Sequence, residues 1–434
     1  MTQVSRCAIR QADFKGWNAY HLENGLIRLV AVPEIGGRIM AYDLGEYAYL
    51  FVDRDLAGQL FSAEENQGDG SLAAWKNYGG DKTWPAPQGW DDDTQWHGPP
   101  DPVLDTGRYS LTELTGDDVY ANIGMTSPPD HRTGVQIVRR ASLRAGSTRV
   151  TLDLTFHNIK DRPICWSIWD VVQLRAERIG TDGRLTHEPG CVMTTPLNPD
   201  SQFESGYHVM FGEPDNPQWQ TPDDSGLFFA PYMWHIGKVG LDSDAGWVAF
   251  SNTAEGYGFA KMFTYEAGQP YPDNGSSVEI WTIGAGQVAN LNYADSDIYL
   301  MEAEVLSPLR EIAPHGKTSF QIEWGACRCD GAILAVQPAG VCTAQPTLTA
   351  SDDGWHLRGG FGVFDEADLL LRGVSADGQT GATLSLGAVS PLRAVTIDRQ
   401  IGELSDVATV ILLTRAHHDG TERQLATLPV PTSS

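Results

Sequence analysis

Apolar and polar residues alternate along much of the chain. Alternation with a period of two places successive side chains on opposite faces of an extended strand. The clearest such segments are residues Leu26–Val32, Thr148–Phe156, Trp247–Asn252 and Thr318–Trp324. Segments with the 3.6-residue period of an amphipathic helix are nearly absent. The pattern therefore predicts an all-β protein built mainly from half-buried strands.

Turn-forming residues and the distribution of tryptophan indicate how these strands are organised. The 434 residues include 46 glycines and 25 prolines, which separate short apolar runs as in a sandwich or barrel with many turns. A chain of this length can form more than one domain. Of its 13 tryptophans, only Trp355 lies beyond Trp324. We expect a large first domain, residues 1–332, and a small immunoglobulin-like β-sandwich, residues 333–434.

The charge balance narrows the classes of partner. The formal net charge is −26, and nucleic acids or anionic membranes are normally bound by clustered Lys and Arg. We therefore expect neither as a partner, and the composition does not indicate an oligomeric state. The first ten residues lack the apolar core of a signal peptide, and no apolar run has the length of a membrane helix. These features lead us to expect a cytoplasmic protein.

The sequence offers little support for a metal or another cofactor. Its six cysteines are scattered, and the spacing of Cys327 and Cys329 is not that of a zinc knuckle. The run Asp91–Asp93 lacks the spacing of a calcium loop. We expect no metal site and no cofactor.

The segment Trp75–His97 is the most distinctive in the chain. It contains four tryptophans, a Gly-Gly-Asp-Lys turn and two prolines, a composition that predicts an irregular loop rather than a helix or a central strand. Aromatic rings suit the C–H faces of sugars, while Asp81, Lys82, Gln88 and His97 can bind hydroxyl groups. The segment thus predicts a carbohydrate site. A rigid loop that caps the end of a sheet is the alternative.

Three segments together resemble the galactose mutarotase-like (aldose 1-epimerase-like) superfamily: Val30–Leu44, Tyr78–Gln88 and Ile298–Pro314. The sequence Gly-Gly-Asp-Lys-x-Trp-Pro-Ala-Pro-Gln in the second segment resembles that of a bacterial branch of it. The resemblance covers about residues 15–330. It implies an antiparallel super-sandwich with a concave, sugar-sized cleft. It also implies that Glu302 is the catalytic glutamate, with Glu304 as the second choice on the same strand face.

One part of the chain departs from that family. Its mutarotases use a glutamate to accept a proton from the anomeric hydroxyl and a histidine to protonate the ring oxygen. The corresponding segment here contains Trp166, Trp169, Asp170 and Gln173 instead of the histidine pattern. The proton donor must then come from elsewhere, and Lys82 and His235 are the candidates. Asp170 interrupts an apolar strand, so it must be paired, hydrogen-bonded or functional.

These observations define a candidate site and two classes of function. The predicted catalytic residues are Glu302, Lys82 and His235. The predicted substrate-binding residues are Asp81, Trp84, Gln88, His97, Arg132, Trp169, Asp170 and Lys238. The first class is an enzyme that acts on a sugar or short oligosaccharide by carboxylate acid/base chemistry, as an epimerase-like, glycoside-cleaving or lyase enzyme. The second class is a carbohydrate-binding or sensing protein without catalysis.

Two further positions carry specific expectations. Glu279 shares its strand face with Trp281, and we expect an exposed strand glutamate there. The pair His417–His418 stands beside an Asp-Gly turn signal, which predicts an exposed hairpin tip rather than a ligand pair.

Overall fold

The computed structural model describes residues 6–89, 95–222, 225–288, 291–292, 296–351, 354–402, 404 and 406–431. Within these residues the chain is almost entirely β-structure. The helical elements of the described residues are two short helices, α1 (Ala63–Gln67) and α2 (Pro272–Gly275), and the 3₁₀ helix Leu72–Ala74. None of the described helices has the length and apolar character needed to cross a membrane. The all-β, antiparallel class predicted from the sequence is confirmed.

The first large sheet has twelve strands and carries most of the residues discussed below. Ten of them follow the order β1-β2-β3-β4-β6-β11-β23-β20-β17-β15, while β5 pairs with β4 and β24 with β11. The strands are β1 (Ala8–Phe14), β2 (Trp17–Glu23), β3 (Ile27–Val32), β4 (Arg38–Leu44), β5 (Tyr47–Ala48), β6 (Asp81–Ala86), β11 (Ile164–Arg175), β15 (His208–Phe211), β17 (Gly237–Leu241), β20 (Val278–Thr282), β23 (Leu300–Leu306) and β24 (Arg310–Ile312). Neighbouring strands are antiparallel throughout.

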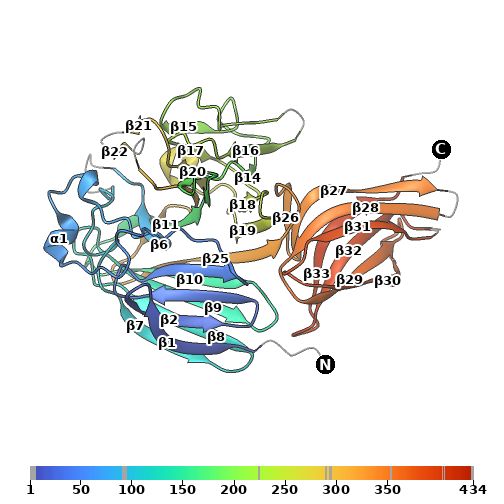
Figure 1. The fold of residues 1–434 in the computed structure, drawn as a ribbon, viewed down its shortest axis with the longest axis horizontal. Coiled ribbons are helices and arrows are strands. Elements are labelled where there is room, and N and C mark those ends of the chain that lie inside the picture. The colour runs from blue at the N-terminus through green and yellow to red at the C-terminus, as the bar shows by residue number, and fades with distance from the viewer. Residues whose placement is uncertain are drawn as a thin grey trace.

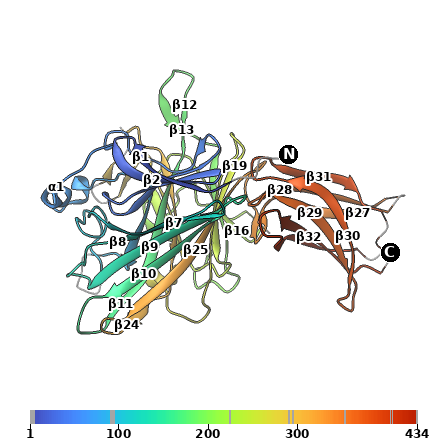
Figure 2. The ribbon, with the colours of Figure 1, turned by 90° about the horizontal axis from the view of Figure 1, so that it is seen from below.

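The second large sheet has nine strands in the order β16-β14-β18-β19-β25-β10-β9-β8-β7. Its strands are β7 (Ser110–Gly116), β8 (Tyr120–Thr126), β9 (Val135–Arg144), β10 (Val150–Asn158), β14 (Cys191–Pro196), β16 (Leu227–Pro231), β18 (Trp247–Asn252), β19 (Tyr257–Phe263) and β25 (Lys317–Arg328). Two small hairpins stand apart, β12 (Glu177–Ile179) with β13 (Leu185–His187), and β21 (Gln287–Val288) with β22 (Leu291–Asn292). Figure 2 shows the β12–β13 hairpin projecting from the body of the protein.

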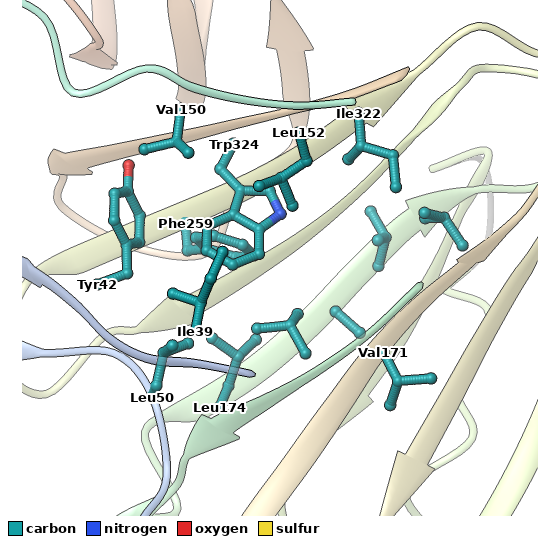
Figure 3. Packing of buried hydrophobic residues seen from close by; sticks show 14 of the residues in the cluster. Ile39, Tyr42, Leu50, Val150, Leu152, Val171, Leu174, Phe259, Ile322 and Trp324 are labelled. Atoms are coloured by element: carbon teal, nitrogen blue, oxygen red, sulfur yellow. The ribbon is translucent and has the colours of Figure 1, made fainter. Parts of the chain in front are cut away.

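Apolar side chains of the two large sheets pack against each other and form the main core. Figure 3 shows Ile39 and Tyr42 of the first sheet beside Trp324 and Phe259 of the second. All four are at most 1% exposed. The Tyr42 hydroxyl donates to the backbone oxygen of Thr148 at 2.5 Å, so even this buried polar group is satisfied. The strand alternation read from the sequence thus corresponds to one face of each sheet buried against the other.

The C-terminal part is a smaller sandwich of two four-stranded sheets, β26-β27-β28-β31 and β30-β29-β32-β33. Its strands are β26 (Ala335–Gln337), β27 (Gly340–Ser351), β28 (Gly354–Val363), β29 (Ala367–Val374), β30 (Thr380–Val389), β31 (Val395–Gln400), β32 (Thr409–Ala416) and β33 (Glu422–Pro429). In Figure 1 it lies beside the larger sandwich, at the end of β25. The expected boundary after residue 332 falls between β25 and β26.

The two sandwiches are joined by a shared apolar cluster. Phe364 is fully buried in one cluster with Cys327 and Ala260 of the larger sandwich. Its backbone oxygen accepts from the Thr148 hydroxyl at 3.1 Å, and the Arg149 guanidinium lies 5.1 Å from its ring centroid. The connection is therefore a packed interface rather than a flexible linker.

One expectation about local structure was wrong, and a second was confirmed only in part. Within the segment predicted to be an irregular loop, residues Asp81–Ala86 form β6, a central strand between β4 and β11. Pro85 is tolerated because β4 pairs with β6 only at Asp81, so the missing N–H breaks no ladder there. The predicted exposed hairpin tip is the turn between β32 and β33. His417 is half-exposed, but the His418 side chain is only 11% exposed and lies against Gly146.

Candidate functional site

The central strands of the first sheet divide their side chains between two faces. Asp81 and Asp170 point toward the second sheet, where they meet Arg139 and Lys261. The neighbouring residue in β6, Lys82, must then point to the opposite face. We call this opposite face the site face. It carries Lys82, Trp84, Trp169, Gln173, Lys238, Glu279, Trp281, Glu302 and Glu304.

Register places part of the site face in one straight row. Gln173 pairs with Glu302, Glu302 with Trp281, and Trp281 with Lys238. Lys238 in turn pairs with Phe211 on the outermost strand. Paired residues on adjacent strands lie about 4.5–5.5 Å apart. The row therefore runs from Gln173 through Glu302, Trp281 and Lys238 to Phe211 at the edge of the sheet.

Glu302 is held by two buried donors. Its Oε1 accepts from the Lys82 ammonium at 3.1 Å and from the Gln173 amide at 2.6 Å. The residue keeps 9% of its surface, whereas Lys82 and Gln173 keep 1% each. The two donors fix the orientation of the carboxylate, and the carboxylate itself still reaches the surface.

Lys82 is a cation in an apolar, aromatic environment. Its ammonium lies 4.7 Å from the ring centroid of Trp84 and 5.7 Å from that of Trp75. Burial lowers the pKa of Lys82 from its ordinary value, although the Glu302 carboxylate opposes this shift. An ammonium of lowered pKa next to a carboxylate is suited to donate a proton.

A second buried ion cluster surrounds Lys238. Its ammonium lies 2.6 Å from Glu279 and 3.0 Å from Glu304, and 4.4 Å from the ring centroid of Trp169. The Trp169 indole donates to Glu304 at 2.8 Å. Burial disfavours the charged amine, but the two carboxylates outweigh it and raise the pKa of Lys238 above its ordinary value. Lys238 is therefore a permanent positive charge at neutral pH.

The carboxyl groups of this cluster retain protons more readily than usual. Burial raises the pKa of Glu304 to about 8 and that of Glu279 to about 7. Nearby carboxylates reinforce both shifts, while Lys238 opposes them. Burial also raises the pKa of Asp273, at the start of α2. One lysine cannot neutralise several buried carboxylates, so protons remain shared among them.

An aromatic cluster of Trp75, Trp84, Trp96 and Trp169 lies at one end of the site face. Trp84 packs against Trp75, Trp96 and Trp169 with ring centroids 6.0, 5.0 and 5.3 Å away. The Trp84 and Trp75 indoles both donate to Asp105, at 3.1 and 2.7 Å. Trp84 and Trp169 are 4% and 3% exposed. These two predicted binding residues thus lie at the site, where they support Lys82 and Lys238 rather than form an open platform.

Asp81 and Asp170 lie on the inner face, away from Glu302. Asp170 is 2.7 Å from the Lys261 ammonium, which also donates to two backbone oxygens. Asp81 is ion-paired with Arg139. Burial, with the nearby Asp170 charge, raises the pKa of Asp81 to about 7. Both aspartates are fully buried between the sheets, so the pairing expected of Asp170 is present, and neither side chain joins the row.

Three residues predicted to bind substrate from loops, Gln88, His97 and Arg132, lie around the aromatic cluster. Gln88 forms a bridge with Trp96, and the His97 ring is 2.8 Å from the backbone oxygen of Gly98. Arg132 is exposed and donates to the backbone oxygen of Gln95 at 3.1 Å. These contacts place all three beside Trp96, at the margin of the site.

His235, a predicted catalytic residue, is exposed in the approach to β17. Its backbone N–H donates to Gln218 at 3.2 Å, and its backbone oxygen accepts from Thr282 at 2.8 Å. The contacts recorded for Glu302 within the described chain are with Lys82 and Gln173, not with the His235 ring. The structure therefore brings together Glu302, Lys82, Trp84, Trp169 and Lys238 and leaves His235 at the periphery.

Several residues were missed or misjudged by the sequence argument. Glu279 was expected to be exposed, but it is fully buried, with the Lys238 ammonium of the adjacent strand 2.6 Å away. Asp105 was missed because no sequence pattern connects it with the Trp75 and Trp84 indoles, which donate to it from distant positions in the chain. Alternation alone does not show which strands pair, so the sequence could not place Trp281 opposite Glu302. The Asp91–Asp93 run lies outside the described residues.

The described residues contain no group of three or more His, Cys, Asp or Glu side chains arranged to hold a metal ion. The carboxylates of the site are bound instead to lysine, glutamine and indole donors.

Comparison with known proteins gives the following similarities. A family model described as a domain of unknown function (DUF4380) matches residues 18–179. No curated protein sequence matches the chain. The chain is similar to the solved structure of YeaD from Salmonella typhimurium, at 10% identity and a TM-score of 0.48, over 76% of this chain and 96% of that one.

Two other solved structures are similar to a comparable degree. One is a galactose mutarotase-like protein from Clostridium acetobutylicum, at 10% identity and a TM-score of 0.45, covering 74% of this chain and 99% of that one. The other is a protein from Synechocystis, at 14% identity and a TM-score of 0.46, covering 73% and 99%. At these identities the similarity concerns the fold alone.

Proposed function

We propose that this protein is a carbohydrate-active enzyme in which Glu302 accepts a proton from a sugar hydroxyl. One observation carries the proposal: a carboxylate fixed by Lys82 and Gln173 reaches the surface directly beside the half-buried ring of Trp281. An indole face suits the C–H face of a sugar ring, and a carboxylate in register with it is in position for a hydroxyl.

The two lysines supply the remaining chemistry. When Glu302 removes a proton from the anomeric hydroxyl, the bond from the anomeric carbon to the ring oxygen breaks and the ring oxygen takes up a proton. Lys82, which is 1% exposed and hydrogen-bonded to Glu302, is suited by its lowered pKa to donate that proton when its ammonium turns from Glu302 toward the ring oxygen. Lys238, which stays charged, stabilises negative charge developing on oxygen. Closure of the ring on either face returns both protons and exchanges the anomers.

The burial of the other carboxylates favours this reaction over glycoside cleavage. Glycosidases place two carboxyl groups on either side of the scissile bond. Glu304 and Glu279, the neighbouring glutamates of the site face, are both 0% exposed. A sugar on this face can therefore touch Glu302 but neither of those two.

A carbohydrate-binding protein without catalysis is the second candidate. The observation in its favour is that Lys82 and Lys238 are both already ion-paired, while His235 lies at the periphery. In this case the row binds a sugar, and no group is free to protonate the ring oxygen.

A panel of neutral aldoses tests the proposal. Binding is measured by calorimetry, and interconversion of anomers by polarimetry or NMR exchange. Binding together with accelerated exchange supports the enzyme. Binding of sugars without acceleration selects the second candidate, and binding of no sugar contradicts both.

A further inference from the structure

The row on the site face continues beyond the residues that the proposed reaction uses. Phe211, at the end of the row, is 47% exposed, which is high for a phenylalanine. Its ring lies 6.4 Å from that of Trp281, edge to face, with an interplanar angle of 74°. Two aromatic rings thus follow each other along the face, starting next to Glu302.

A β-bulge is responsible for the orientation of Phe211. Val209 pairs with Val239, but the register then shifts, so that Phe211 rather than Met210 stands opposite Lys238. Regular alternation would place Met210 on the site face and turn Phe211 to the other side. Bulges commonly re-aim a side chain near a functional site. Here the bulge presents a large aromatic ring where the regular strand would have presented methionine.

The length of the row exceeds that of a single sugar ring. Glu302, Trp281, Lys238 and Phe211 lie on four adjacent strands, and strands are spaced by about 4.8 Å, which separates the first and last Cα atoms by about 14 Å. A pyranose stacked on Trp281 with its anomeric carbon at Glu302 covers only the first part of this distance. The ring of Phe211 remains for a second unit.

Lys238 stands between the two aromatic residues in the register of the row. Lys238 has three N–H donors, and its two carboxylate partners, Glu279 and Glu304, lie below it in the next row. The Lys238 side chain as a whole keeps 7% of its surface. These carboxylates and the Trp169 ring hold the ammonium beside the row, and the rings of Trp281 and Phe211 meet each other directly.

We infer that the ligand of this face is an oligosaccharide of at least two units, with one ring on Trp281 at Glu302 and the next on Phe211. The inference rests on the proposed function for the first ring. Phe211 determines the preference for length and takes no part in proton transfer, since three strand spacings separate it from Glu302.

Calorimetry with matched sugars tests this second subsite. The probes are glucose and galactose, with the disaccharides maltose, cellobiose, lactose and melibiose. The wild-type protein is expected to bind at least one disaccharide about tenfold more tightly than the parent monosaccharide, the scale of one aromatic contact. Phe211→Ala should remove that gain and leave monosaccharide affinity unchanged, while Phe211→Tyr should keep it.

The control is Met233→Ala, because Met233 is also exposed, at 45%, but is not part of the row. It should bind every probe as the wild type does. Equal affinity for mono- and disaccharides, or a disaccharide preference that survives in Phe211→Ala, would overturn the second subsite and leave the proposed function intact. Failure of the wild type to bind any of the probes would overturn both.

Discussion

The Lys82 ammonium and the Glu302 carboxylate lie 3.1 Å apart, although 220 residues separate them in the chain. Strands β6 and β23 are brought together by β11, which pairs with both. A second ion pair, Asp170–Lys261, lies on the other face of the same strands at 2.7 Å. The two pairs differ in exposure. Asp170 and Lys261 are both fully buried, whereas the Glu302 side chain keeps 11% of its surface.

The Asp170–Lys261 pair is predicted to stabilise the fold and to have no other role. Lys261→Met leaves the Asp170 carboxylate buried without its cation, which should lower the free energy of unfolding by about 3–5 kcal/mol. The double variant Asp170→Leu/Lys261→Met should recover most of this loss, because no buried charge remains. Urea unfolding measures both. Lys317→Met, on the surface, is the control and should change stability by no more than about 0.5 kcal/mol. A Lys261→Met protein as stable as this control would refute the structural role.

The carboxyl cluster around Lys238 predicts a specific pH dependence. Burial raises the pKa of Glu304 from 4.5 to about 8, so the folded protein holds a proton that the unfolded chain has released. This contribution to stability is complete below pH 4.5 and is lost as the pH rises toward about 8. Glu304→Gln removes the titrating group. Its stability relative to the wild type should therefore increase between pH 5 and pH 8.

Urea unfolding at several pH values within that range provides the measurement. Glu311→Gln, an exposed substitution of the same kind, should show a difference from the wild type that does not change with pH. A constant difference for Glu304→Gln as well would show that the Glu304 carboxyl titrates normally.

Gly36 is predicted to fix the segment that carries Asp105. Its φ is +79°, and a Cβ atom there would lie 1.8 Å from the backbone oxygen of Asp105. Gly36→Ala should displace this segment and disturb the hydrogen bonds from Trp75 and Trp84 to Asp105. Gly183 has a similar φ of +78°, but nothing lies within 4 Å of an added Cβ. Gly183→Ala should therefore lower the free energy of unfolding only by the cost of the left-handed backbone conformation, about 1–2 kcal/mol.

The comparison of these two variants isolates the steric effect. Gly36→Ala should be clearly less stable to urea than Gly183→Ala and should show altered tryptophan fluorescence. Equal losses of stability in the two variants would mean that the contact with Asp105 is unimportant.

Much of the fold was predictable because alternation is a local property. Residues Trp247–Asn252 form β18 as expected, and the predicted strand Thr148–Phe156 corresponds closely to β10, Val150–Asn158. The shared face of Glu302 and Glu304 also followed from alternation. The strand β6 was missed because Pro85 within it, with Gly79 and Gly80 before it and Pro87 after it, indicates a loop, and only its one-sided pairing makes Pro85 acceptable.

The site was predictable only in part because its character depends on pairing between distant strands. Lys82, Glu302 and Lys238 were selected by motif and do lie on one face. The sequence could not separate them from Asp81 and Asp170, whose partners Arg139 and Lys261 belong to the opposite sheet. The position of Phe211 could not be predicted either, since a bulge overrides the alternation in β15.

The Glu302→Gln variant tests the central claim most directly. Glutamine keeps the shape of the side chain but cannot accept the proton, and loss of a positioned base commonly slows such a step by about 10²–10⁴-fold. Turnover and affinity for the same sugar are measured in this variant, with Glu311→Gln as the control. The account predicts that Glu302→Gln binds the sugar with little change and loses turnover by that factor, while the control keeps both. Full turnover in a folded Glu302→Gln protein would contradict it.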